Sequence, residues 1–201
     1  MLYINDRIEQ LDLKAALSAV SEQRRTYALR YRHEHDQRLC VAAYQLLQQA
    51  LNIEYGISEM PLFEYDSHGK PSLAGHQEIY FNLSHCHEAA ACVVSNAPVG
   101  IDIESIGRYD EELVETIMNT DEQHIIRQSS NPPLSFIRLW TMKESLVKLT
   151  GEGLSKNMQD VLKANGYHFQ TTIFPHFVCT VCEYKRERFS SVFCNEFTYS
   201  H

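Results

Sequence analysis

Two short stretches of the chain carry acidic and basic residues at spacings that suit phosphate chemistry. They read Val-Gly-Ile-Asp-Ile-Glu at residues 99–104 and Trp-Thr-Met-Lys-Glu-Ser-Leu-Val-Lys at residues 140–148. Alternate side chains of a strand share a face, so Asp102 and Glu104 point the same way. Glu144 and Lys148 lie one helical turn apart. Because Mg²⁺ takes a few carboxylates and completes its shell with substrate oxygens, this set predicts metal-assisted chemistry on a phosphate.

The second stretch also has a purely structural interpretation. A Glu and a Lys at positions i and i+4 of an exposed helix form a common pair that is worth about 0.2–0.5 kcal/mol. Taken alone, Glu144 and Lys148 fit this interpretation better than a catalytic one. Their combination with Asp102 and Glu104 in one chain favours the metal site.

The composition is that of a folded globular protein. With 201 residues, 44% of them hydrophobic and 22% charged, the chain suits one domain or two small lobes. Residues 1–6 lack the features of a secretion signal, and no apolar run approaches the roughly 18 residues of a membrane span. We therefore expect a cytoplasmic protein that does not cross a membrane.

The charge distribution bears on binding partners. A formal net charge of −8 argues against a nonspecific nucleic-acid binder, which needs a basic surface. Basic residues nevertheless concentrate near the N-terminus, at Lys14, Arg24, Arg25, Arg30, Arg32 and Arg38. This cluster suits a small anionic ligand or an acidic partner, and equally a solvated helix face.

The six cysteines do not form the dense framework of a small secreted domain, so we expect free thiols. Cys179 and Cys182 have a C-x-x-C spacing but lie in a strand-like run, where they point to opposite faces and pack. The run from His85 to His87 suggests zinc at first sight, but adjacent residues of an extended chain cannot all face one metal.

Periodicity and punctuation predict runs of helices followed by runs of strands in each half, which makes an α+β protein. The expected helices span 12–32, 34–51, 111–128 and a stretch that Asn131 caps, Pro132 opens and Gly151 closes. The expected strands span 79–83, 89–94 and 99–103, with a turn at 66–71 and three antiparallel strands within 166–197. In the last helix, a core stripe is expected at Leu139, Met142, Leu146 and Leu149, with Glu144 and Lys148 on roughly the opposite side.

Four blocks of the sequence, which follow one another in the same order as in the family, resemble the 4′-phosphopantetheinyl transferases. The resemblance is more specifically to their surfactin-synthetase-activating type. The strand motif Gly-Ile-Asp-Ile-Glu and the helix motif Trp-Thr-Met-Lys-Glu-Ser-Leu-Val-Lys fit the family without a gap. The other blocks are Gly69-Lys70-Pro71 and Phe81-Asn82-Leu83-Ser84-His85, and the Arg-rich helix that ends at Arg38 matches more loosely. Together they cover more than half of the chain.

The resemblance implies transfer of the phosphopantetheine arm of coenzyme A to a serine of an apo carrier protein, acyl or peptidyl, with release of adenosine 3′,5′-bisphosphate. It places Mg²⁺, or Mn²⁺, on Asp102, Glu104 and Glu144. Glu144 would also be the general base, so that Glu144, Lys148 and Asp102 form the catalytic set. Lys148 would contact the pyrophosphate.

The same resemblance implies the coenzyme A contacts. Ser84 and His85 would bind phosphates, and Gly69, Lys70 and Pro71 would shape the loop around the nucleotide. The remaining residues assigned to the coenzyme A site are Arg38, Asp102, Lys143 and Lys148. Of these, Lys143 also has a structural interpretation, in which its stem packs and its amine reaches solvent.

Family members of this length consist of two similar α+β halves related by a pseudo-twofold axis, with coenzyme A between them. The halves expected here are 1–98, which contacts the coenzyme A phosphates, and 99–201, which carries the metal and catalytic residues. Such a chain should act as a monomer. Two alternatives stay open, a metal-dependent phosphoesterase or nuclease and a non-catalytic module that binds carrier proteins. The motifs do not identify the carrier.

Overall fold

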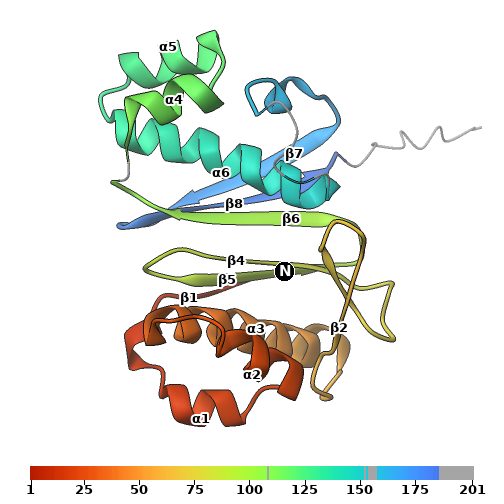
Figure 1. Ribbon diagram of the computed structural model, residues 1–201. Helices are drawn as coiled ribbons and strands as arrows, with labels where there is room; N and C mark the ends of the chain where they lie inside the picture. Colours follow the sequence, from red (N-terminus) through yellow and green to blue (C-terminus); the bar gives the residue numbers. More distant parts are fainter. Residues whose placement is uncertain (108, 152, 154–157, 186–201) are drawn as a thin grey trace, which may run out of the picture.

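Two three-stranded antiparallel sheets form the centre of the computed structural model, which describes residues 1–107, 109–151, 153 and 158–185 (Figure 1). The first sheet has the order β1 (Leu2–Asn5), β5 (Ala90–Ser95), β4 (Tyr80–His85). The second has the order β6 (Val99–Ser105), β8 (Phe177–Tyr184), β7 (Tyr167–Ile173). The strands predicted in these regions are confirmed, β1 was missed, and the last expected strand lies outside the described residues.

Helices cover the outer face of each sheet (Figure 1). The first sheet carries α1 (Leu13–Ser18), α2 (Glu22–Ala28) and α3 (Glu34–Tyr55). The second carries α4 (Glu111–Ile117), α5 (Thr120–Gln128) and α6 (Pro132–Thr150). Short 3₁₀ helices η1 (Ile8–Gln10) and η2 (Val161–Lys163) and the hairpin of β2 (Phe63–Tyr65) and β3 (Pro71–Leu73) complete the fold.

The two halves share one topology. In each, a first strand leads to helices, the longest helix packs on the sheet, and two further antiparallel strands follow. In each sheet the strand that comes last in the sequence, β5 or β8, is the central strand, and the other two strands flank it. The α+β fold with two similar halves is therefore present, although the sequence shows no repeat.

Two of the predicted helices are each broken into two. The expected helix at 12–32 forms α1 and α2, because Ser21 is buried and its side chain caps the amide of Arg24. The expected helix at 111–128 forms α4 and α5, because Asn119 and Glu122 make a reciprocal capping box. Both caps satisfy backbone amides that a continuous helix would have bonded internally.

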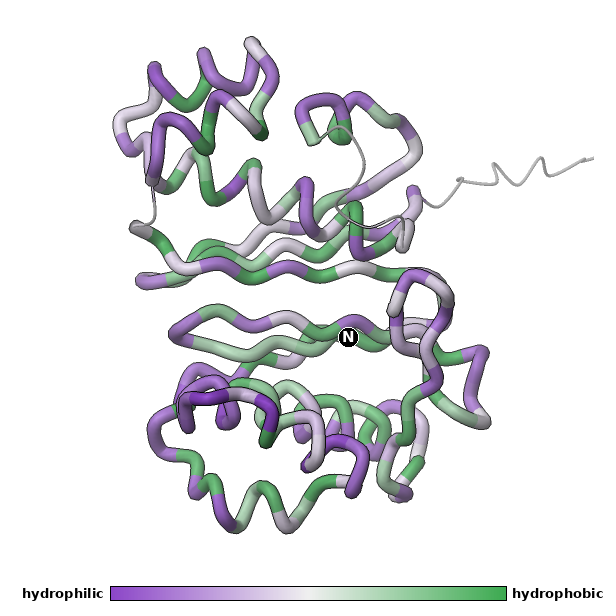
Figure 2. The backbone as a smooth tube through the Cα atoms, in the orientation of Figure 1, coloured by the Kyte–Doolittle hydropathy of each residue, from purple (hydrophilic) through white to green (hydrophobic). Residues whose placement is uncertain are grey.

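Strand β6 divides its side chains between two packing partners. Ile101 and Ile103 are fully buried against the first sheet, and Figure 2 shows the alternation of hydrophobic and hydrophilic positions along this strand. Gly100 lies against α6, where an added Cβ would overlap the carbonyl oxygen of Ser145 and lie 2.6 Å from the amide nitrogen of Leu149. The helix thus sits on the strand at backbone contact distance.

This close approach corrects the core stripe predicted for α6. Leu146 and Leu149 are buried as expected, but Leu139 and Met142 are only half-buried. The sheet is met instead by small hydroxyl residues such as Thr141, whose Oγ1 lies 2.8 Å from Oγ1 of Thr180. A helix that approaches a glycine this closely has room only for small side chains. The caps at Asn131 and Gly151 are confirmed.

The cysteines confirm a further expectation. All five cysteines in the described residues are free and buried. Cys179 packs between the sheets and Cys182 packs on the other face with α6, so the two point to opposite faces as predicted. Among the helices described, none has both the length and the apolar character to cross a membrane.

Candidate functional site

The site forms where β4 and β6, the facing edge strands of the two sheets, lie side by side under one end of α6 (Figure 1). Asn82 fixes this junction, because its buried side-chain oxygen accepts a hydrogen bond from the amide of Ile101 at 3.0 Å. Two residues further along β4, Ser84 donates to Oδ1 of Asp102 at 3.0 Å. The two halves of the molecule are therefore joined by polar contacts at the site itself.

A buried triangle of hydrogen bonds unites three of the predicted residues. Nζ of Lys148 lies 2.6 Å from Oδ1 of Asp102 and 2.9 Å from Oγ of Ser84. Each member comes from a different element, namely β4, β6 and α6. Asp102 is buried, and Lys148 supplies the positive partner that its buried carboxylate needs.

Glu144 approaches this triangle from α6. Burial, and next the negative charge of Asp102, raise the pKa of the Glu144 carboxyl to about 7, although Lys148 opposes the shift. Within the described residues, Oε1 of Glu144 and Oδ2 of Asp102 are buried and have no hydrogen-bond partner. Buried oxygens of this kind are costly unless something binds them, and a cation would do so.

The third predicted metal ligand lies on the same face of β6 as Asp102. Oε1 of Glu104 accepts a hydrogen bond from Nε1 of Trp140 at 3.2 Å. In the described ranges, no three side chains among His, Cys, Asp and Glu are close enough together to hold a metal as they stand. The donor set and the two partnerless oxygens nevertheless fit a hard divalent cation.

A pocket of about 250 Å³ opens beside these residues. Gly69, Lys70 and Pro71 line one side of it, and Glu144 and Lys148 line the other. Nζ of Lys70 donates to the carbonyl oxygen of Leu149 at 2.8 Å, and desolvation lowers the pKa of this lysine. The β2–β3 loop and α6 are thus brought together, as the coenzyme A assignment requires.

His85 lies directly after Ser84, at the end of β4. Part of its surface is exposed, yet the surrounding protein removes water from the ring. This desolvation, followed by the positive charge of Lys148, lowers the pKa of His85. A neutral imidazole offers one donor and one acceptor next to the buried triangle.

Lys143 does not belong to this site, which corrects its assignment to coenzyme A. Its side chain is 0% exposed, and Nζ lies 2.7 Å from Oε2 of Glu122 and 2.7 Å from the carbonyl oxygen of Met158. Desolvation lowers the pKa of Lys143, while Glu122 opposes that shift. Successive residues of a helix point about 100° apart, so Lys143 faces the protein interior while Glu144 faces the cleft.

Arg38 does not line the pocket either. Its guanidinium donates to the carbonyl oxygen of Leu11 and to Glu34, each at 3.2 Å. Arg24 likewise bonds the carbonyl oxygen of Cys40 and lies over the Tyr27 ring, 5.3 Å from its centroid. These contacts hold the N-terminal helices together, and a coenzyme A contact of Arg38 stays a prediction.

Sequence reasoning missed the roles of two residues. Trp140 belongs to the helix motif, but nothing in the motif indicated that its indole nitrogen would reach Glu104. Asn82 was visible as a polar residue inside an apolar strand, and a buried amide normally has a specific partner. That partner is a backbone group on β6, which the sequence could not identify.

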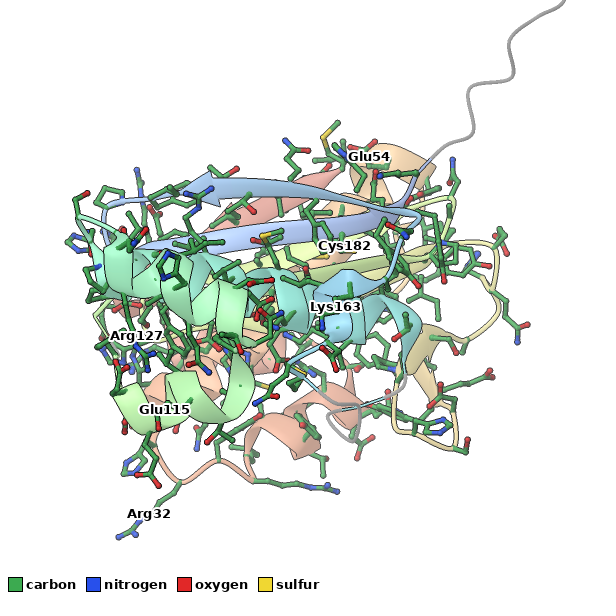
Figure 3. The ribbon with its side chains drawn as sticks, turned by 90° about the horizontal axis from the view of Figure 1, so that it is seen from above. Arg32, Glu54, Glu115, Arg127, Lys163 and Cys182 are labelled. Atoms are coloured by element: carbon green, nitrogen blue, oxygen red, sulfur yellow. The ribbon has the colours of Figure 1, made fainter. Side chains whose placement is uncertain are left out.

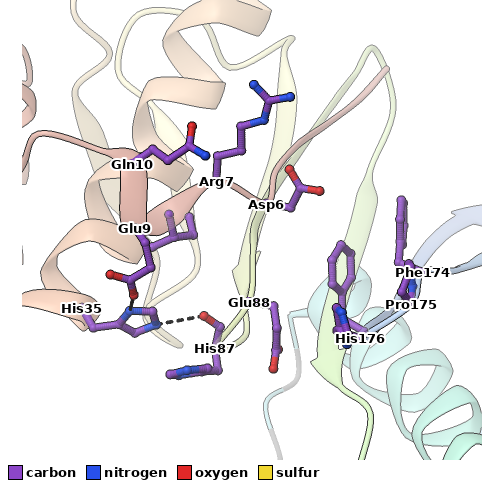
Figure 4. Close-up of a pocket in the computed structure, with 12 residues that line it drawn as sticks. Asp6, Arg7, Glu9, Gln10, His35, His87, Glu88, Phe174, Pro175 and His176 are labelled. Atoms are coloured by element: carbon purple, nitrogen blue, oxygen red, sulfur yellow. Dashed lines mark hydrogen bonds and ion pairs between the residues drawn. The ribbon is translucent and has the colours of Figure 1, made fainter.

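A second pocket, of about 430 Å³, lies between η1, the β4–β5 turn and the β7–β8 turn (Figure 4). Its His35 ring lies 2.7 Å from Oε1 of Glu9 through Nδ1 and 2.8 Å from the carbonyl oxygen of His87 through Nε2. Both nitrogens are therefore occupied by protein acceptors. We assign no step of the chemistry to this pocket.

Comparison with known proteins gave matches to a family model and to several curated relatives. Residues 98–194 match the family model of the 4′-phosphopantetheinyl transferase superfamily. The 4′-phosphopantetheinyl transferase psf-1 of Bacillus pumilus is 32% identical over 155 residues, which cover 76% of this chain and 66% of that protein.

Two further relatives are 4′-phosphopantetheinyl transferases by name. Gsp of Aneurinibacillus migulanus is 35% identical over 144 residues, with 68% of this chain and 58% of that protein covered. Sfp of Bacillus subtilis strain 168 is 25% identical over 157 residues, with 77% and 70% covered. The chain thus spans roughly two thirds of the length of these relatives.

Proposed function

The chain belongs to the 4′-phosphopantetheinyl transferase superfamily, as its motifs predicted, and from this premise we propose the reaction that it catalyses. It transfers the 4′-phosphopantetheine group of coenzyme A to a serine hydroxyl of an apo acyl or peptidyl carrier protein. Adenosine 3′,5′-bisphosphate is released. The observation that carries the proposal is the pair of partnerless carboxylate oxygens on Asp102 and Glu144. Glu144 itself lines the pocket beside the Gly69–Pro71 loop.

Asp102, Glu104 and Glu144 are the residues that would hold the metal, Mg²⁺ or Mn²⁺. When bound, such an ion supplies charge neutralisation, which lowers the repulsion between an incoming hydroxyl and the pyrophosphate and stabilises the leaving phosphate. The buried carboxylates, which otherwise repel one another, support this assignment.

Glu144 has the properties of a general base. Without a metal its carboxyl has a pKa of about 7, and in the ionised form it can accept the proton of the carrier serine. The serine oxygen then forms a bond to the phosphorus that bears pantetheine, and the bond from this phosphorus to the bridging oxygen breaks. The electron pair leaves with the adenosine bisphosphate.

The other residues bind and orient the substrate. Lys148 presents an ammonium with three donors to the pyrophosphate, and Ser84 and His85 contribute further donors at the end of β4. Lys70 is directed to the phosphates at the adenosine end. Residues 1–98 thus contribute most of the phosphate contacts, and residues 99–201 contribute Lys148, the metal ligands and the base. Because one chain holds both halves, it acts as a monomer, and we place it in the cytoplasm.

The test is to incubate the protein with coenzyme A, Mg²⁺ and a panel of apo carrier proteins, and to read the intact mass of each carrier. We expect a gain of one phosphopantetheine group that a chelator abolishes. Glu144→Gln should keep coenzyme A bound and lower the transfer rate roughly 10²–10⁴-fold. Full turnover of this variant would contradict the base assignment. Cleavage of coenzyme A without any carrier would instead identify a phosphoesterase, and carrier binding without transfer a non-catalytic module.

A further inference from the structure

Lys148 occupies the carboxylate that we assign to the metal. Its Nζ is 2.6 Å from Oδ1 of Asp102, and Ser84 also donates to this oxygen. The other oxygen, Oδ2, is buried without a hydrogen-bond partner. One buried carboxylate therefore has one oxygen filled by protein donors and the other unfilled.

We propose that Lys148 competes with the divalent metal for Asp102, and that tight metal binding requires the anionic pyrophosphate to draw the ammonium away. This inference rests on the proposed function, because it takes the metal and coenzyme A as the ligands of the site. Beyond that function, Lys148 serves as an internal cation that makes the affinity for metal depend on the presence of substrate.

The charges around Asp102 determine the strength of the competition. Glu144 on α6 and Glu104 on β6 contribute carboxyl groups, and α6 also contributes the ammonium of Lys148. Strand β4 contributes the hydroxyl of Ser84 and the imidazole of His85. A divalent ion on the Asp102 carboxylate would share it with the ammonium, so the two cations would repel each other. A charge within about 4–6 Å of a carboxylate typically changes the equilibrium constant for binding a cation, such as a proton, by about one to three powers of ten.

The side chain of Lys148 is able to move in the way that the proposal requires. It is 29% exposed, whereas Asp102 is 4% exposed, and it forms part of the wall of the pocket beside Glu144. A lysine carries its charge on a flexible four-carbon stem, so its ammonium can turn from Asp102 toward an anion in the pocket. Asp102, held between β4 and α6, stays in place.

Thermodynamic linkage gives the proposal a second consequence. If coenzyme A removes the ammonium from Asp102, it raises the affinity for metal, and metal raises the affinity for coenzyme A by the same factor. Direct contact between metal and pyrophosphate also couples the two ligands. The share of this coupling that Lys148 contributes is the share that disappears when the charge of Lys148 is removed.

The experiment is a titration with Mn²⁺, followed by the electron paramagnetic resonance signal of the free ion, without coenzyme A. We expect Lys148→Met to bind Mn²⁺ on the order of tenfold more tightly than the parent protein. Lys163→Met is the matched control, since Lys163 also pairs with an aspartate at 2.6 Å but is 66% exposed (Figure 3). This control should not change Mn²⁺ affinity, and Asp102→Asn should weaken it.

A repeat with saturating coenzyme A completes the test. The parent protein should gain more Mn²⁺ affinity from coenzyme A than Lys148→Met gains. If Lys148→Met binds Mn²⁺ no better than the parent while Asp102→Asn loses binding, the competition is wrong and the metal site stands. If no protein binds Mn²⁺ with or without coenzyme A, the metal assignment of the proposed function is wrong as well.

Two further variants cover a folding defect in Lys148→Met. Lys148→Gln removes the charge and keeps a polar group for Ser84, so it should bind Mn²⁺ more tightly than the parent. Lys148→Arg keeps the charge and should bind no more tightly than the parent. Equal Mn²⁺ affinity of these two variants would overturn the proposal.

Discussion

Two lysines of helix α6 form ion pairs of nearly the same length in very different surroundings. Lys143 lies 2.7 Å from Glu122, and Lys148 lies 2.6 Å from Asp102. The first pair is closed, because Lys143 is 0% exposed and also bonds the carbonyl oxygens of Met158 and Gln159. The second pair is open to a pocket and leaves Oδ2 of Asp102 without a hydrogen-bond partner.

The N–O distance alone therefore does not distinguish a structural ion pair from an ion pair in a ligand-binding site. A buried pair whose hydrogen-bonding groups are satisfied contributes to holding elements together, and here it joins α5, α6 and the segment at Met158. A buried pair with partnerless oxygens beside a pocket retains the capacity to bind a ligand. The predictions below test this difference, in order of decreasing effect.

Lys143→Met should have the largest effect on stability, a loss of about 3–5 kcal/mol, because it leaves Glu122 buried without its partner. Chemical unfolding measures this loss, and the variant of the exposed pair, Lys163→Met, should unfold close to the parent protein. The double variant Lys143→Met/Glu122→Leu should recover most of the loss. Folded Lys143→Met should bind coenzyme A as the parent does. A stable variant with weakened coenzyme A binding would return Lys143 to the site.

Gly100→Ala disturbs both pairs at once, since both belong to the helix that contacts this glycine. The new methyl group would overlap the carbonyl oxygen of Ser145, and backbone atoms cannot move aside as a flexible side chain does. Overpacking of this kind costs about 1–3 kcal/mol, and occasionally more. Unfolding in urea should show the loss, and transfer activity should fall with it. An unchanged unfolding midpoint would show that α6 has freedom to shift on β6.

Glu144 gives the open pair a pH dependence of stability in the presence of a chelator. Its pKa is raised from 4.5 to about 7, so the folded protein retains a proton that the unfolded chain has released. Stability from this group is therefore highest at low pH and falls as the pH rises from about 4.5 to about 7. Glu144→Gln should be more stable than the parent above pH 7, and the difference should narrow toward pH 4.5. A constant difference over this range would contradict the shift.

Trp140→Phe tests the weakest contact of the open site. Phenylalanine keeps the stacking of ring 140 on Phe136 but removes the donor that reaches Glu104 at 3.2 Å. We expect a stability loss of about 1 kcal/mol and a few-fold lower transfer rate. The metal dependence of the rate should move to higher Mg²⁺ concentration, because Glu104 loses this hydrogen bond. No change in that dependence would limit Trp140 to packing.

Local patterns were enough to predict several parts of the molecule. The alternation in Val99–Ser105 placed Asp102 and Glu104 on one face of a strand, and β6 has this arrangement. Asn131, Pro132 and Gly151 marked the ends of α6 correctly. Such features depend on residues within a few positions of one another, which a sequence displays directly.

Tertiary structure decided the remainder. The sequence did not show that the helices would break at Ser21 and Asn119, because these polar residues become caps only where the packed chain turns. No repeat in the sequence shows that the two halves share one topology, which only the family resemblance implied, since many different side chains satisfy the same packing.

The tertiary structure also determined which residues form the site. The sequence by itself determined the chemical types, the carboxylates of a metal site and the lysines of a phosphate site, and their spacing identified the family. The meeting of β4 with β6 brought Ser84 to Asp102 and Lys148, and the packing of α6 turned Lys143 inward to Glu122. Adjacent lysine and glutamate residues of one motif thus have separate roles, because a helix directs successive side chains to different surroundings and only the fold supplies those surroundings.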